Sequence, residues 1–235
     1  MSESTFPPAL ADFAAKARAR LGRLPGHRPV PMPEGLGGDD MVSPDGAYRI
    51  RRWAVGTPAL ALADVQEFHG QVAGVRVIAV PAPEHPAPIL GIFAAVGPRG
   101  PLAAVADLSP VSAEGLPVDF RRLLVSPLRP DLPAVRELPD WAAVFSADCL
   151  SVTPQDEAQL DRFCAFAHTL LDGYLAVGAS AVPLGSQRHQ EYLSSWERYR
   201  EVQMTEPGRR AVLTRVLGAP GADRHLREVL FPALA

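Results

Sequence analysis

Two acidic residues, Asp107 and Glu206, lie at positions where a carboxylate could have either a structural or a chemical role. Asp107 ends the unbroken apolar run Leu102–Ala106, just before a turn that begins at Ser109. Glu206 lies at the expected start of a helix, three residues before Arg209. A carboxylate at the edge of a buried site can take part in proton transfer. It can equally cap a turn or favour a helix N-terminus through the helix dipole. For Asp107, turn capping is the stronger interpretation.

Other catalytic or cofactor motifs are missing from the sequence. The six histidines are dispersed, with His168 and His189 in expected helices and His225 near the end of the chain. No Cys/His group has zinc-ligand spacing, and no P-loop or G-x-G-x-x-G run is present to bind a phosphate. The sequence therefore predicts neither a bound cofactor nor a metal site. Redox chemistry would depend on the substrate and an external electron donor.

The composition is typical of a globular protein with one sizeable core. The 235 residues carry a net charge of −3, with 47% hydrophobic and 21% charged residues, which gives no basic footprint for nucleic acid. No apolar run approaches the roughly 20 residues that span a membrane, and the first ten residues lack a signal-peptide pattern. Cys149 and Cys164 are predicted to be buried thiols. We expect a cytoplasmic monomer that binds neither nucleic acid nor membrane.

An antiparallel sheet is predicted for the first half of the chain. The run Gly100–Pro110, bounded by turn residues, is expected to be a central strand buried on both faces. Ala59–Phe68 is ambiguous between a strand and a short helix. The short turns between successive strands favour an antiparallel meander over parallel βαβ units. The other predicted strands are Tyr48–Val55, Val75–Val80, Ile89–Val96 and the short Asp148–Val152.

Helices are predicted before and after the strands in the sequence. The Pro- and Gly-rich residues 23–47 are expected to form a loop after the first helix. Thr205 is expected to cap a helix that has Pro207 in its first turn and ends at Gly218. Strands followed by helices, without internal repeats, predict a single domain over residues 1–235. The helical stripes cover residues 8–22, Gln155–Val177, Ser186–Gln203 and Ala222–Phe231, with a short helix near Asp119–Leu124.

Four runs in this order and spacing resemble the ferredoxin-dependent bilin reductases, most closely the phycocyanobilin:ferredoxin oxidoreductase branch. The resemblance covers roughly Val75–Ala235, and the N-terminal third is compatible with it. The four runs are PILG (Pro88–Gly91), LAAVADLSP (Leu102–Pro110), ELPDWAAVFSADCLSVTP (Glu137–Pro154) and the C-terminal RRAVLTRVLG with HLREVLF.

This resemblance implies a fold and an activity. The fold is an α/β class, three-layer α/β/α sandwich with a central antiparallel sheet flanked by helices. A linear tetrapyrrole such as biliverdin lies between the sheet and the C-terminal helices. Enzymes of this family hold no cofactor and reduce the bilin with single electrons from ferredoxin, coupled to protonation by side chains. The protein must then bind a dianionic tetrapyrrole, exclude water and supply protons.

The proton donors are where the sequence departs from the family. Phe93 stands where the family has an aspartate on the bilin-lining strand, and Arg76 stands where the phycocyanobilin branch has a histidine. The family's carboxylate at the penultimate helix is retained as Glu206, which we expect to be catalytic. Arg76, Phe93 and Asp107, the last from the DLSP run, are expected to contact substrate. Phe93 would stack on the tetrapyrrole, and Arg76 would pair with a propionate or a pyrrole carbonyl.

Two alternatives remain open from the sequence. In the first, the pocket is lost or filled, so that Phe93 is core and Arg76 points to solvent. Independently of this alternative, Trp141 and Phe145 are predicted to be core. In the second, the chain is a divergent bilin-binding protein that keeps the fold without turnover. A cofactor-free enzyme for another small aromatic substrate is less favoured. An arginine-rich face on the C-terminal helices is expected either to dock an acidic ferredoxin or to be an ordinary solvated surface. Its members are Arg209, Arg210, Arg215, Arg224 and Arg227.

Overall fold

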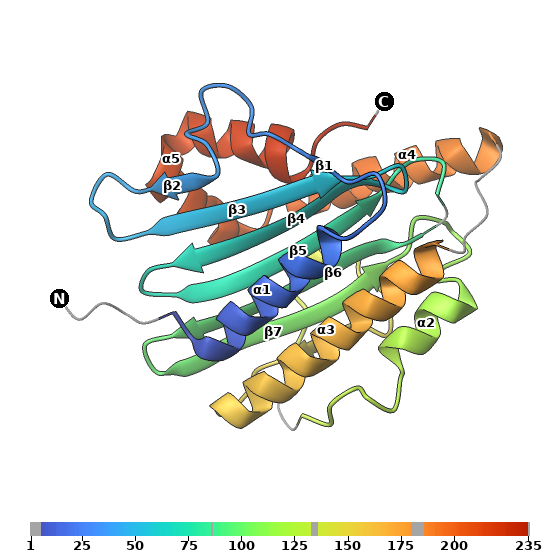
Figure 1. The fold of residues 1–235 in the computed structure, drawn as a ribbon, viewed down its shortest axis with the longest axis horizontal. Helices are drawn as coiled ribbons and strands as arrows, with labels where there is room; N and C mark the ends of the chain where they lie inside the picture. The colour runs from blue at the N-terminus through green and yellow to red at the C-terminus, as the bar shows by residue number, and fades with distance from the viewer. Residues whose placement is uncertain (1–5, 86, 133–135, 180–185, 235) are drawn as a thin grey trace.

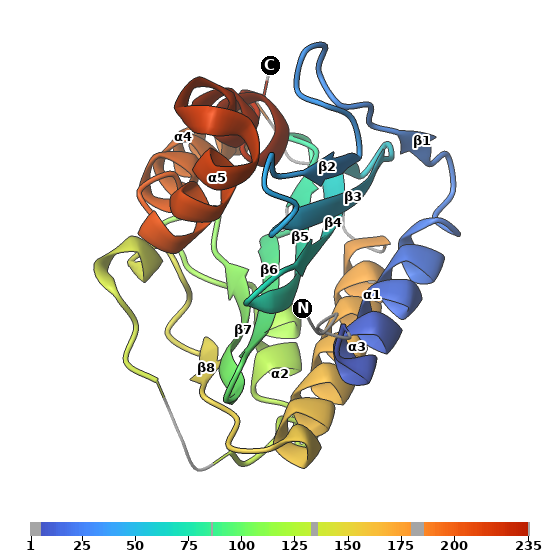
Figure 2. The same cartoon turned by 90° about the vertical axis from the view of Figure 1, so that its left-hand side faces the viewer.

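A single sheet lies between two layers of helices. The computed structural model describes residues 6–85, 87–132, 136–179 and 186–234. In this part of the chain, α1, α2 and α3 cover one face of the sheet, and α4 and α5 cover the other (Figures 1 and 2). The predicted α/β/α sandwich with a central antiparallel sheet is therefore confirmed.

The sheet is an antiparallel meander extended at both edges. Its order is β1-β3-β4-β5-β6-β7-β8, and β2 also pairs with β3. Every pairing is antiparallel, as the short predicted turns require. The run that was ambiguous between helix and strand is β4. The strands are β1 (Arg28–Pro29), β2 (Asp40–Val42), β3 (Arg49–Gly56), β4 (Leu60–His69), β5 (Ala73–Pro81), β6 (Ile89–Gly97), β7 (Gly100–Ser109) and β8 (Leu150–Val152).

Two predictions about this sheet are wrong. The strand that begins at Gly100 is not central, because β7 lies next to the short edge strand β8. It is buried on both faces from Ala103 onward because helices cover both sides. The central strand is β5, in which all nine residues are buried. Residues 23–47 are also not wholly loop, since they contribute β1 and β2 to the edge of the sheet.

The helices follow the predicted stripes closely. In α1 the five buried side chains are the five predicted ones, Leu10, Phe13, Ala14, Ala17 and Leu21. The helices are α1 (Pro8–Leu21), α2 (Val118–Leu124), the 3₁₀ turn η1 (Asp140–Ala142), α3 (Glu157–Ala179), α4 (Ser186–Gln203), α5 (Pro207–Arg224) and the π-helical turn η2 (His225–Leu230).

The start of α5 differs from the prediction, and its interior break agrees with it. Glu206, not Thr205, is the N-cap, because Glu206 directly precedes the first helical residue and its carboxylate accepts hydrogen bonds from the N–H groups of Gly208 and Arg209. Gly218 has φ 72° and ψ 167°, which interrupts the helix. That left-handed φ is accessible to glycine at little cost, so the predicted end at Gly218 appears as a sharp kink between two helical segments.

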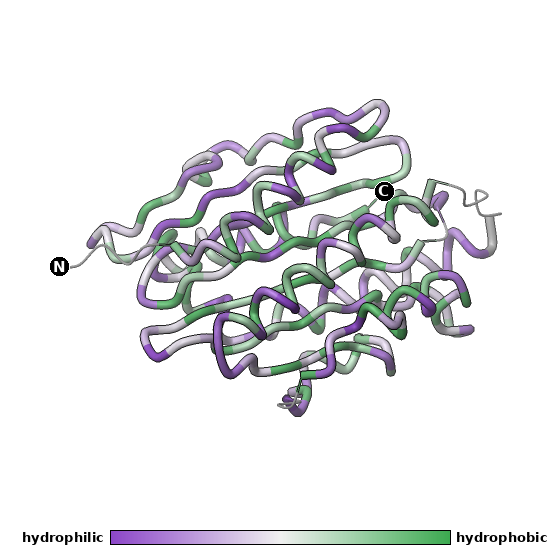
Figure 3. Tube along the Cα trace, turned by 60° about the horizontal axis from the view of Figure 1, so that its bottom comes forward, coloured by the Kyte–Doolittle hydropathy of each residue, from purple (hydrophilic) through white to green (hydrophobic). Residues whose placement is uncertain are grey.

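The two faces of the sheet have different chemistry. Side chains alternate along each strand, so Val75 and Val77 of β5 face α1 and α3, whereas Arg76 and Ile78 face α4 and α5. The face toward α1 and α3 carries a large apolar cluster, beside which Glu67 is buried in an ion pair with Arg18. Hydrophobic and hydrophilic stretches alternate along the strands and around the helices (Figure 3). The polar, cavity-bearing face is the one toward α4 and α5.

None of the helices in the described ranges combines the length and the hydropathy of a membrane span. Both cysteines are free. Cys164 is buried as predicted, whereas Cys149 is only partly buried.

Candidate substrate pocket

A cavity of about 340 Å³ lies between the sheet and the C-terminal helices. This volume is within the range of small-molecule sites. The sheet contributes Arg76, Gly91 and Phe93 to the wall, and the helices contribute Tyr199 and Arg209. The pocket is therefore present on the face that the family resemblance predicted.

Arg76 and Phe93 are direct cross-strand neighbours in this wall. Arg76 is 7% exposed, and its Nη1 and Nη2 atoms have no hydrogen-bond partner. Burial lowers the pKa of Arg76, and the nearby Asp64 carboxylate opposes that shift. Phe93 is partly exposed toward the cavity and is not enclosed in the core. The alternative that places Arg76 in solvent and Phe93 in the core is therefore wrong, because both side chains line the cavity.

A second arginine approaches the same wall from α5. The guanidinium carbons of Arg76 and Arg209 lie 5.3 Å and 5.2 Å from the centre of the Phe231 ring. Arg209 donates a hydrogen bond of 2.6 Å to the carbonyl oxygen of Gln203. Burial, and next the charge of Arg76, lower the pKa of Arg209 to about 10. Two largely buried cations thus converge on one side of the cavity, an arrangement that suits an anionic ligand.

Glu206 lines the pocket while acting as a helix cap. Its Oε1 accepts a 2.8 Å hydrogen bond from the Gly208 N–H, and its Oε2 accepts one of 2.5 Å from the Arg209 N–H. The Arg209 Nε atom is 4.0 Å from Oε2. The structure therefore brings Glu206 together with Arg76 and Phe93 at one cavity. Its role in proton transfer stays a prediction.

Asp107 occupies a different position from the other predicted site residues. It is fully buried and does not line the cavity. Its carboxylate accepts hydrogen bonds from the Ser109 hydroxyl (2.6 Å), the Ser146 hydroxyl (2.5 Å) and the Ser146 N–H (3.2 Å). Burial raises the pKa of Asp107, and these hydrogen bonds oppose the shift. The capping interpretation accounts for this geometry, since Asp107 fixes the segment that leads into β8.

Sequence reasoning missed a group of buried polar residues beside the pocket. Asp64 accepts a 2.6 Å hydrogen bond from Arg52 Nε, but its Oδ1 has no partner. Burial raises the pKa of Asp64, and Arg52 and Arg76 oppose the shift. The side-chain polar atoms of Gln66 and His225 are also buried without partners, and burial lowers the pKa of His225 to about 3. The sequence signal for this group was the presence of polar residues, Asp64 and Gln66, at alternate positions of β4. Their burial could not be predicted because the pairing register of β4 was not known.

Trp141 and Phe145 were predicted to be core, and that prediction is wrong. Both are partly exposed and line the cavity. Their rings meet edge to face, with centroids 6.0 Å apart. Gln203 of α4 donates a 2.9 Å hydrogen bond to the Trp141 carbonyl. The η1 segment is thereby held against α4 as one wall of the pocket.

The arginines of the C-terminal helices are mostly neutralised. Arg209 points into the cavity, and Arg227 has no ion pair among the residues described. The remaining three form ion pairs: Arg210 with Asp223, Arg215 with Asp45 at 3.2 Å, and Arg224 with Glu228 at 2.9 Å. Their excess positive charge at the surface is thus smaller than the sequence indicated. No group of three or more potential metal ligands is found within the described ranges.

The fold and the cavity together define an α/β/α sandwich with a small-molecule pocket between its sheet and its C-terminal helices. The comparison with known families identifies its class. A model of the family described as ferredoxin-dependent bilin reductase matches residues 14–232. The chain belongs to the ferredoxin-dependent bilin reductases.

Its curated relatives lie in the predicted branch. The chain is 28% identical over 237 residues to the phycocyanobilin:ferredoxin oxidoreductase of Prochlorococcus marinus (strain MIT 9313), covering 95% of this chain and 86% of that protein. It is 26% identical to that of Synechococcus sp. (strain CC9902), covering 95% of this chain and 92% of that protein. The crystal structure of tomato phytochromobilin synthase in complex with biliverdin has the same fold. That match has a TM-score of 0.68 and 17% identity, over 95% of this chain and 80% of the other.

Proposed function

We propose that this protein reduces a linear tetrapyrrole such as biliverdin, with reduced ferredoxin as an external electron donor. The observation that carries the proposal is the cavity of about 340 Å³ on the α4–α5 face of a bilin-reductase fold, with Arg76 and Arg209 buried in one wall. Such a site has the apolar lining and the few fixed polar groups of a small-molecule pocket.

The electrostatics of the pocket suit a dianionic ligand. Four arginines and one glutamate line it, so positive charge is in excess. Arg49 is paired with Asp40, and Arg209 lies near Glu206. Arg76 and Arg136 have no ion pair within the described residues. These two side chains are the ones free to bind carboxylate or carbonyl oxygens, because a guanidinium donates several hydrogen bonds from a planar group.

The walls suit a flat conjugated ligand. Phe93 presents a ring from the sheet, and Phe145 and Trp141 present rings from the segment before β8. Aromatic rings stack on extended π-systems and exclude water. An electron added to the ligand would then remain in a site where side chains are the nearest proton donors. We assign that supply first to Glu206, the one carboxylate among the lining residues.

The proposed electron donor, ferredoxin, is taken from the family to which the chain belongs. Ferredoxin is proposed to dock near the arginine-rich C-terminal helices. The arginines of that surface are mostly paired with acidic residues of this chain, and Arg227 is the one without an ion pair in the described part. An acidic ferredoxin would therefore either use Arg227 or compete for the paired arginines.

Anaerobic titration with biliverdin, followed by reduced ferredoxin and a regenerating system, tests the proposal by absorbance. A spectral shift on binding and a second shift on reduction would support a reductase. A shift on binding that does not change under reducing conditions would support the binding-protein alternative. Phe93, which places a ring where the family has an acid, motivates this alternative. If no bilin or haem-derived tetrapyrrole gives a spectral shift, both the reductase and the binding-protein hypotheses are wrong.

A further inference from the structure

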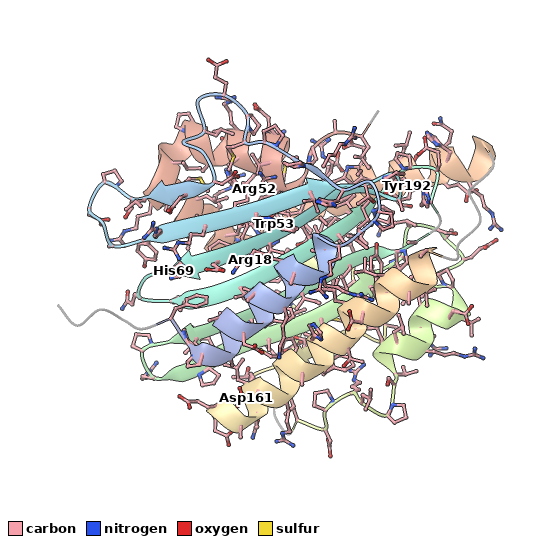
Figure 4. The ribbon with its side chains drawn as sticks, viewed as in Figure 1. Arg18, Arg52, Trp53, His69, Asp161 and Tyr192 are labelled. Atoms are coloured by element: carbon pink, nitrogen blue, oxygen red, sulfur yellow. The ribbon has the colours of Figure 1, made fainter. Side chains whose placement is uncertain are left out.

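Three large polar aromatic residues of α4 are buried, and one differs from the others. The Tyr192 hydroxyl donates a 2.6 Å hydrogen bond to the Pro81 carbonyl, and the Trp196 indole N–H donates one of 2.9 Å to the Pro232 carbonyl (Figure 4 labels Tyr192). Tyr199 is 5% exposed, yet within the described part of the chain its hydroxyl has no hydrogen-bond partner. Tyr199 lines the cavity, and its hydroxyl is not one of the fully enclosed unpaired atoms. The hydroxyl is therefore within reach of a ligand that enters the cavity, and it has no protein partner that would compete for its proton.

The Tyr199 hydroxyl faces the sheet at Gly91. A Cβ atom placed on Gly91 would be 3.7 Å from the Tyr199 oxygen. Both residues line the cavity. Gly91 is two residues before Phe93 on the same strand and therefore points to the same face of the sheet. The phenol oxygen thus lies on the same face as Phe93, the position at which the family resemblance places an acidic residue.

The phenol is held rigidly in this position. Its ring stacks on Trp196 with centroids 5.7 Å apart and an interplanar angle of 15°. It meets the Phe231 ring at 65°, with a centroid distance of 6.2 Å. Both contacts are in the buried core between α4, η2 and the sheet. A proton donor fixed by packing loses little freedom on contact with the reacting atom.

The two buried arginines favour the anionic form of this phenol. Burial raises the pKa of Tyr199 to about 12, and the charges of Arg76 and Arg209 act in the opposite direction. The hydroxyl consequently keeps its proton at neutral pH. A phenolate formed by proton donation would be stabilised by the same two guanidinium groups.

We propose that Tyr199 donates a proton to the tetrapyrrole during its reduction, in place of the acid that the chain lacks at Phe93. This inference rests on the proposed function. Reduced ferredoxin gives one electron to the bilin and is itself oxidised. The Tyr199 O–H bond then breaks, its electron pair stays on the phenol oxygen, and the proton forms a new bond to an oxygen or nitrogen of the bilin. The phenolate recovers a proton from water, and a second electron and proton complete each double-bond reduction.

Tyr199→Phe tests this assignment, with Tyr192→Phe as the matched control on the same helix. Both changes remove one hydroxyl and keep the ring. Tyr199→Phe is expected to bind biliverdin within about threefold of the wild-type affinity, and to shift the absorption band of the bound bilin because a hydrogen bond to the chromophore is lost. Its turnover is expected to fall by a factor on the order of 10²–10⁴, the contribution of a positioned general acid. One-electron-reduced bilin should accumulate, measured by electron paramagnetic resonance.

The control separates catalysis from packing. Tyr192→Phe removes a backbone hydrogen bond outside the cavity lining, so it should lower stability and leave the bound spectrum and turnover unchanged. If Tyr199→Phe keeps both the wild-type spectrum and the wild-type turnover, the assignment is overturned while the proposed function stands. If the wild-type protein binds no bilin or reduces none, the proposed function fails and the assignment fails with it.

Discussion

Replacing Arg76 with methionine is expected to stabilise the unliganded protein and weaken bilin binding at the same time. Arg76 is 7% exposed, its two terminal nitrogens lack hydrogen-bond partners, and burial lowers its pKa. Methionine has a similar length and needs no partners. The free protein would lose a buried, poorly satisfied cation, and the complex would lose the group best placed to bind an anion.

The size of both effects follows from the contacts. An unsatisfied buried polar group costs about 1–3 kcal/mol, and the contact with Phe231, at 5.3 Å, offsets about 0.5–2 kcal/mol of this. The free energy of unfolding should therefore rise by about 1 kcal/mol, which raises Tm by about 2–4 °C in a chain of this size. Loss of a charged hydrogen bond to the ligand, about 1.5–3 kcal/mol, should raise the Kd for biliverdin about 10- to 150-fold.

Urea unfolding without ligand and absorbance titration with biliverdin measure the two effects. Arg49→Met is the matched control, because Arg49 also lines the pocket but is 42% exposed and paired with Asp40. That change should leave the free energy of unfolding nearly unchanged, because an exposed ion pair contributes little to stability, and it should alter the Kd by only a few-fold. An Arg76→Met protein that is less stable than wild type and binds biliverdin normally would refute the reasoning, since Arg76 would then be a structural cation.

Three further predictions address single residues. Glu206→Gln should lower the free energy of unfolding by about 0.5–1 kcal/mol through the weakened helix cap and should slow bilin turnover with binding largely intact; unchanged turnover would remove Glu206 from the mechanism. His225 has its pKa lowered to about 3 by burial, so the unfolded chain binds the extra proton below about pH 6.5 and stability rises with pH between about 3 and 6.5. Lowering the pH from 7 to 5 should therefore reduce the free energy of unfolding by about 2 kcal/mol through this group. Urea unfolding at the two pH values measures this reduction, which the His225→Leu protein should not show. Phe93→Asp places a carboxylate directly across from Arg76 and should yield a new reduction product by chromatography; the same products as wild type, or none, would show that this position does not control protonation.

Much of the fold was accessible from the sequence because single elements carried their own periodicity. The stripe from Leu10 to Leu21 identified both α1 and its buried face, and turn residues bounded each strand of the meander. The position of a strand within the sheet was not accessible in this way. Burial on both faces made the run from Gly100 look central, yet β7 gains its burial from helices on both sides and lies next to the edge.

The candidate site was accessible only in part. Family motifs led to Arg76, Phe93 and Glu206, which the fold brings to one cavity. Tyr199 and Trp141 looked like ordinary core aromatics, because periodicity shows that a side chain is buried but not whether a cavity lies beside it. Their place in the wall depends on the docking of α4 and η1 on the sheet, which is a tertiary contact without a local sequence signal.

The two faces of the sheet differ in how completely their buried polar groups are paired, and this difference bears on local stability. The α1–α3 layer packs through a nearly uniform apolar core, with Arg18 of α1 paired with Glu67 of β4 at its edge (Figure 4). The α4–α5 layer covers more unpaired polar groups, such as those of Gln66 and His225, than the α1–α3 layer, where the Tyr174 hydroxyl is unpaired. Unpaired buried groups lower the stability of the contact that encloses them. Local opening has its lowest free energy where such contacts are poorest. We therefore expect the first local opening of the fold in the C-terminal layer, at the edge where these polar groups lie, and later opening of the α1–α3 layer.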